Sequence, residues 1–138
     1  APGDLYTSTV PNLLVSGIAD ALRAAKAPVI YVVNLMTRAS ETAGYTASRH
    51  VGAIARYGGR TPDAVLAHRG AVPGELLARY ASEGSAPVAV DVEALRGLGV
   101  KTVRLADIMS RTSLVRHDPA RTAEALVALF GELAPRRP

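Results

Sequence analysis

The polar stretch at residues 34–45 carries more functional groups than a connection between two elements needs. It offers an amide, four hydroxyls, a guanidinium and a carboxylate, from Asn34, Thr37, Arg38, Ser40, Glu41, Thr42 and Tyr45. An apolar, β-branched run at residues 29–33 precedes it, and a helix opening at residues 46–50 follows. Because open α/β sheets bind ligands at loops that leave the carboxyl ends of their strands, we expect this loop to form one wall of a site.

A second group of hydroxyls lies in the turn sequence at residues 3–8, shortly before Pro11. A glycine- and hydroxyl-rich turn that enters a helix presents free backbone N–H groups, which attract anions. Further along, Ser16 before Gly17 is a candidate N-cap for the next helix. We therefore expect an anion-binding element near the N-terminal end of the sequence.

The histidines do not define a metal centre. His50, His68 and His117 lie far apart and none has a second ligand at helical spacing, so we predict no metal site. His50 follows a helix start, which leaves two interpretations open: a cationic neighbour of a bound phosphate, or a solvent-facing residue beside the cap. A Ser48–His117–Asp118 triad lacks a nucleophile-elbow pattern and is rejected, so no catalytic residue is assigned.

Three later residues, Arg116, Tyr80 and Asp118, could serve either the fold or a site. Arg116 ends an irregular segment and could clamp a phosphate or form a surface ion pair. Tyr80 lies on an apolar stripe and is expected to pack in the core with its hydroxyl at the edge. Asp118 before Pro119 fits an N-cap better than a general base.

The elements that must position these groups alternate between strands and helices. Strands are predicted at residues 29–33, 64–67, 87–90 and 100–105; helices at 46–58, 73–83, 92–98 and from 118 onward, after a first helical region near residues 11–25. Ala123, Leu126, Val127, Phe130 and Leu133 form the predicted apolar stripe of the last helix. This order predicts an α/β fold: a Rossmann-like, layered parallel sheet with helices on both faces.

Composition excludes several classes of protein. The 138 residues are 49% hydrophobic and include no cysteine, which fits one globular unit without disulfides. The net charge of +4 comes from scattered basic residues, with one Phe and no Trp for base stacking, so nucleic acid is not expected. No apolar run is long enough to span a bilayer. We expect a cytoplasmic protein with no membrane span.

Three segments carry a resemblance to a known family. PNLLV after PGDLYTS, then NLMTRASETAGYTASRHV, and VRHD before the last helix resemble the gluconeogenesis factor (YvcK-like) family, which shares a superfamily with the CofD 2-phospho-L-lactate transferases. Members have a larger doubly wound domain that opens with a glycine-rich nucleotide-binding loop. The resemblance therefore implies that residues 1–138 are the C-terminal half of such a CofD-like domain.

The resemblance also implies a set of ligand-binding residues. The phosphate-side turn corresponds to residues 3–8, the loop motif to residues 34–42, and a tyrosine and an arginine contact the nucleotide sugar. Carried over by position, the predicted ligand-binding residues are Gly3, Tyr6, Thr7, Ser8, Asn34, Thr37, Glu41, Thr42, Tyr80 and Arg116, to which we add His50.

The sequence departs from the family pattern at several of its polar positions. Asp4 replaces a serine, and its carboxylate would repel phosphate unless a metal lay between them. His68 replaces a strand-end asparagine and is a further candidate for the cleft. The other departures are Arg38 for glutamine, Ser40 for glycine, Ala43 for aspartate and Arg49 for aspartate.

Three functions follow as hypotheses. The first is a non-catalytic regulator of carbon metabolism, cell-wall synthesis and cell shape that binds a nucleotide sugar such as UDP-N-acetylglucosamine. The second is a CofD-like transferase that moves a phospholactyl group to a deazaflavin with Mg²⁺; the loss of two acidic positions argues against it. The third is an interaction module without a small ligand. A homo-oligomer, in the form of a dimer, is expected.

Overall fold

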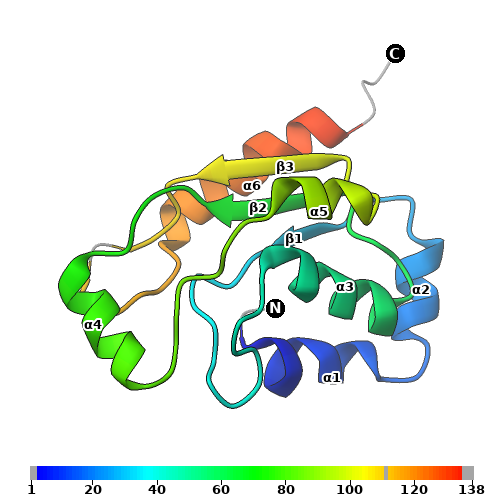
Figure 1. The fold of residues 1–138 in the computed structure, drawn as a ribbon. Coiled ribbons are helices and arrows are strands. Elements are labelled where there is room, and N and C mark those ends of the chain that lie inside the picture. Colours follow the sequence, from blue (N-terminus) through cyan, green and yellow to red (C-terminus); the bar gives the residue numbers. More distant parts are fainter. Residues whose placement is uncertain (1–2, 111, 135–138) are drawn as a thin grey trace.

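The sheet has three parallel strands in sequential order. In the computed structural model, which describes residues 3–110 and 112–134, they are β1 (Ile30–Val32), β2 (Ala64–His68) and β3 (Thr102–Ala106), ordered β1-β2-β3 (Figure 1). Ile30 pairs with Ala64, which pairs in turn with Thr102. The predicted α/β class with a parallel sheet is confirmed.

Helices cover both faces of this sheet, as predicted. The helical elements of the described residues are the π-helix η1 (Leu5–Thr9), α1 (Val10–Leu13), α2 (Ile18–Ala24), α3 (Ala47–Gly58), α4 (Gly74–Ser82), α5 (Val92–Gly97) and α6 (Pro119–Leu133). Alternate residues of β2 enter two cores: Val65 and Ala67 pack with α3 and α5, whereas Leu66 packs with Leu129 of α6 on the other face (Figure 1). The central strand is therefore apolar throughout because both of its faces are buried.

The predicted strand at residues 87–90 is wrong. This segment forms only isolated bridges, Met36 with Pro87 and Thr46 with Ala89. Its backbone bonds the loop after β1: Val88 N–H donates to Leu35 O at 3.0 Å, and Ala47 N–H donates to Ala89 O at 2.8 Å. Pro87 has no N–H with which to hydrogen-bond a neighbouring strand. The segment therefore holds the loop after β1 in place and does not add a fourth strand to the sheet.

The N-terminal turn is more ordered than predicted. Residues 5–9 form the π-helix η1, which runs directly into α1. Ser16 does not cap α2: the N-cap is Gly17, whose φ of 84° lies in the left-handed region that glycine adopts without strain. The correction follows from the reversal between α1 and α2, which needs that backbone conformation.

The last helix begins as predicted but presents a different face. Asp118 caps α6, and its Oδ1 accepts from Arg121 N–H at 3.0 Å. Leu129 is fully buried, whereas Val127 is 73% and Phe130 51% exposed and Ala123 is exposed too, so the predicted stripe is wrong at these three residues. Apolar residues surround much of this helix, and periodicity alone could not select the side that meets the sheet. None of the helices described in the structure combines the length and hydrophobicity that crossing a bilayer requires.

Candidate functional site

A cavity of about 1310 Å³ lies against β1 and the loop that follows it. Its lining is mixed: polar side chains occur beside apolar ones that include Ile30, Val32 and Leu126, and we call this apolar part the trough. Four segments distant in sequence contribute to it: the N-terminal turn, the loop after β1, the end of α4 and the approach to α6. Of the eleven predicted ligand-binding residues, those lining it are Gly3, Ser8, Asn34, Thr37, Tyr80 and Arg116.

Asn34 joins the N-terminal turn to the carboxyl end of β1. Its Nδ2 donates to Gly3 O at 3.1 Å, and its Oδ1 accepts from the Tyr31 hydroxyl at 3.1 Å. Burial raises the pKa of Tyr31, so that hydroxyl stays protonated and remains a donor. Asn34 thus fixes the distance between two walls of the cavity.

The two loop threonines are buried and hold the loop in shape. Thr37 Oγ1 accepts from Ala86 N–H at 2.9 Å, and Thr42 Oγ1 accepts from Arg38 N–H at 2.8 Å. Thr37 borders the cavity, whereas Thr42 does not. The resemblance implies ligand contacts for both, and the geometry gives both a role in positioning the loop.

Glu41 occupies one of the backbone N–H groups at which we expected an anion. Its Oε2 accepts from Tyr6 N–H at 2.6 Å, and its Oε1 accepts from the Thr7 hydroxyl at 3.3 Å. None of these three residues lines the cavity. The start of η1 is therefore satisfied by a carboxylate of the protein itself.

Two departures from the family pattern compensate each other. Arg38 donates from Nε to Asp4 Oδ2 at 2.7 Å, and its Nη2 lies 2.5 Å from the same oxygen. Hydrogen bonding to Asp4 raises the pKa of Arg38. Both residues line the cavity, so the Asp4 carboxylate is neutralised by a neighbouring cation without a metal.

Arg116 and Arg79 supply positive charge to the cavity. Both side chains line it and are exposed, and neither forms an ion pair within residues 3–110 and 112–134. The Tyr80 hydroxyl accepts from Val115 N–H at 3.2 Å and thereby links α4 to the segment that carries Arg116. Sequence reasoning missed Arg79; its signal was its place beside Tyr80 in the last turn of α4.

His50 faces the core instead of the cavity. It is 1% exposed, its Nδ1–H donates to Thr46 O at 2.9 Å, and its ring meets Tyr45 edge-on at 5.6 Å between centroids. Burial lowers the pKa of His50 and favours the neutral ring. The solvent-facing interpretation is wrong, and a buried neutral ring does not provide a cationic neighbour for phosphate.

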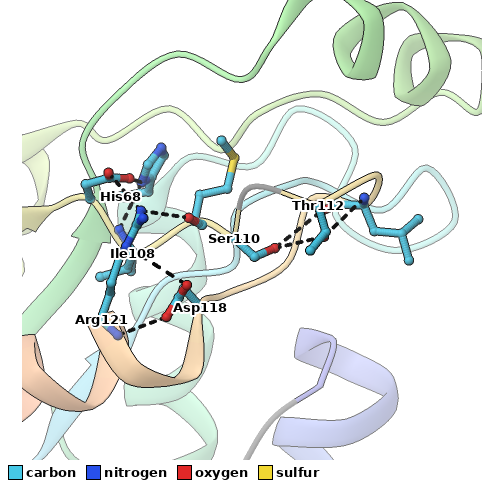
Figure 2. Close-up of polar contacts among 9 residues, drawn as sticks. His68, Ile108, Ser110, Thr112, Asp118 and Arg121 are labelled. Atoms are coloured by element: carbon cyan, nitrogen blue, oxygen red, sulfur yellow. Dashed lines mark hydrogen bonds and ion pairs between the residues drawn. The ribbon is translucent and has the colours of Figure 1, made fainter.

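The other two histidines lie at the carboxyl edge of the sheet. His117 lines the cavity and donates from Nε2 to Val33 O at 3.1 Å, while burial lowers its pKa; sequence reasoning did not include it. His68 does not line the cavity: its Nδ1 accepts from Ile108 N–H at 3.3 Å, in the network that continues to Asp118 and Arg121 (Figure 2). Among the described residues no group of three or more histidine, aspartate or glutamate side chains is placed to hold a metal.

Comparison with known proteins agrees with this architecture. The sequence profile described as 2-phospho-L-lactate transferase CofD matches residues 1–109. A solved crystal structure of a UPF0052-family protein from Bacillus halodurans superimposes with a TM-score of 0.86 at 39% identity, covering 92% of this chain and 41% of that one.

Curated relatives carry the name gluconeogenesis factor. A putative gluconeogenesis factor of Nostoc is 46% identical over 134 residues, one of Deinococcus radiodurans 42% over 138, and the gluconeogenesis factor of Bacillus subtilis 36% over 132. These matches cover 94–99% of this chain but only 28–42% of the relatives' lengths. By the profile match over residues 1–109, the chain belongs to the CofD family.

Proposed function

We propose that the cavity beside β1 binds a nucleotide sugar of the UDP-N-acetylglucosamine type, and that binding regulates carbon metabolism without catalysis. One observation carries the proposal: Asn34, Tyr80 and Arg116, from three distant segments, line one cavity. Arg116 and Arg79 give that cavity positive charge suited to a diphosphate, and the trough along β1 suits a base or sugar ring. The relatives' name, gluconeogenesis factor, suggests the metabolic setting.

Calorimetric titration of the full-length protein with UDP-N-acetylglucosamine tests this proposal. We expect saturable binding that Arg116→Ala weakens by about 2 kcal/mol, the contribution of a charge-assisted hydrogen bond. Arg96→Ala is the matched control, because Arg96 is exposed on α5, pairs with Glu93 at 2.6 Å and lies outside the cavity. Absence of heat and of a thermal shift at millimolar ligand would contradict the proposal.

A second candidate is a CofD-like transfer of a phospholactyl group to a deazaflavin, with Mg²⁺. The profile match favours it. The Asp4 carboxylate, which could have contributed to a cation site, is instead paired with Arg38. Formation of the phospholactyl product by the full-length protein would support this candidate over the regulator; nucleotide-sugar binding without turnover would support the regulator.

A further inference from the structure

A second hollow lies on α3 and is separate from the cavity beside β1. Its volume is about 300 Å³, and it shares no lining residue with the larger cavity. Residues of η1, of the loop after β1 and of one face of α3 surround it: Tyr6, Tyr45, Arg49, Gly52, Ala53, Arg56 and Tyr57. No acidic residue lines it.

Arg49 and Arg56 both lie on this face of α3, and each guanidinium is positioned over a tyrosine ring. The Arg49 Cζ lies 4.5 Å from the Tyr45 centroid, and the Arg56 Cζ lies 5.6 Å from the Tyr57 centroid. Both side chains are exposed, and neither has an ion pair in the part of the chain that the structure describes. Stacking on the rings holds the guanidinium planes while their N–H groups remain available to an anion.

Gly52 lies between the two arginines and keeps the surface concave. A Cβ added there would meet nothing within 4 Å, and its φ is not in the positive range. A glycine inside a helix costs roughly 0.5–1 kcal/mol relative to alanine. A large side chain at this position would enter the hollow, which Gly52 leaves open.

The tyrosines add neutral donors to the two charges. The hydroxyls of Tyr6 and Tyr45 lie 3.2 Å apart, and their hydrogen bond raises the pKa of Tyr6 to about 12. The Tyr6 hydroxyl is therefore protonated near neutral pH. One hydrogen of the pair closes the bond between them, which leaves the other to donate elsewhere.

We propose that this hollow binds a phosphate monoester of a small molecule. Two guanidiniums and tyrosine hydroxyls line the hollow, and these are donors from which phosphate oxygens accept hydrogen bonds; the volume is at the low end for a small-molecule pocket. The ligand class and place of this site differ from those of the proposed nucleotide-sugar site.

Titration of the full-length protein with glycerol 3-phosphate, and separately with inorganic phosphate, tests the proposal. Calorimetry measures the binding. We expect saturable binding of the ester that falls at least tenfold in the Arg49→Gln/Arg56→Gln variant. Tighter binding of the ester than of inorganic phosphate indicates that the organic part also enters the hollow.

Three further variants separate the two sites. Gly52→Leu should fill the hollow and abolish ester binding while improving helix propensity. Arg96→Gln and Arg116→Gln, which remove charge elsewhere, should leave ester binding unchanged. No saturation at millimolar ester, unchanged affinity in the double arginine variant, or loss of binding in Arg116→Gln would each overturn the proposal.

Discussion

At the scale of single residues, the ion pair between Arg38 and Asp4 balances the negative charge that Asp4 brings to the cavity. A carboxylate beside a diphosphate would repel it, and the two guanidinium nitrogens of Arg38 at one oxygen of Asp4 reduce that repulsion. The pair also ties the N-terminal turn to the loop after β1, as the Asn34 amide does.

Removing only the cation should therefore weaken anion binding. We expect Arg38→Gln to reduce nucleotide-sugar affinity by about 1 kcal/mol, because Asp4 is then left with an uncompensated charge near the phosphates. The Asp4→Asn/Arg38→Gln variant should recover most of the loss. Calorimetry on the wild type, the single variant and the double variant checks this. Equal affinity of the single and double variants would show that the charge of Asp4 does not affect ligand binding.

His50 makes stability depend on pH. Its folded pKa is lowered from about 6.5 by burial, so the unfolded chain binds more protons at mildly acidic pH. The stabilisation is complete above pH 6.5 and is lost as the pH falls from there toward the folded pKa; His117 shifts in the same direction. We expect Tm to fall between pH 7.5 and 5.5.

A His50→Gln variant separates this effect from general acid sensitivity. Glutamine can still donate to Thr46 O but does not titrate, so the slope of Tm against pH should flatten although the variant starts from a lower Tm. A slope identical to that of the wild type would assign the dependence to other groups.

At the scale of elements, α3 is capped from a distant segment. Thr46, its own N-cap, makes no capping bond; Asp91 at the start of α5 accepts instead from Ser48 N–H at 2.9 Å and from the Ser48 hydroxyl at 2.5 Å. Burial opposes ionisation of Asp91, but hydrogen bonds from Ser48 outweigh it and lower the pKa of this carboxyl. One residue thus fixes both the first turn of α3 and its contact with α5.

Asp91→Ala should destabilise the protein by about 1–2 kcal/mol, the usual cost of losing a cap. Urea unfolding measures this, with Glu93→Ala as control, because Glu93 is exposed and forms only an i,i+3 ion pair on α5. A loss no larger than that of the control would mean that water replaces the cap.

The sequence predicts elements well where local signals and burial agree. Gly59 ends α3 in the left-handed conformation, Asp118 and Pro119 begin α6, and β2 is apolar because it is central. The segment at residues 87–90 has strand-like residues, yet its partner is a loop. Pairing of that kind is a tertiary property that no local pattern encodes.

The candidate site is predictable to a similar extent. Asn34, Tyr80 and Arg116 could be grouped because loops after parallel strands converge and because the resemblance supplied the tyrosine and arginine. Glu41 and His50 were misplaced for a physical reason: a carboxylate or imidazole near a helix start can serve the protein's own backbone as readily as a ligand. Only coordinates distinguish the two.

At the scale of the whole molecule, the sheet and its apolar surfaces suggest that more protein covers them. Among the described residues Val127 and Phe130 are exposed on α6, and Leu105 is exposed on β3. The curated relatives described above are more than twice as long as the matched segment. We propose that further residues of the complete protein pack on these surfaces, as in a larger doubly wound domain.

Substitution of the exposed pair on α6 tests this proposal. Val127→Ser/Phe130→Ser should change the stability of the 138-residue chain by less than about 0.5 kcal/mol, because surface substitutions cost little. In the complete protein the same change should cost about 2–5 kcal/mol, since it would remove two buried apolar side chains. Urea unfolding of both proteins gives the comparison, with Leu105→Ser, at an exposed position on β3, as a second probe. Equal, small losses in the two contexts would show that this face of α6 is a free surface in the complete protein as well.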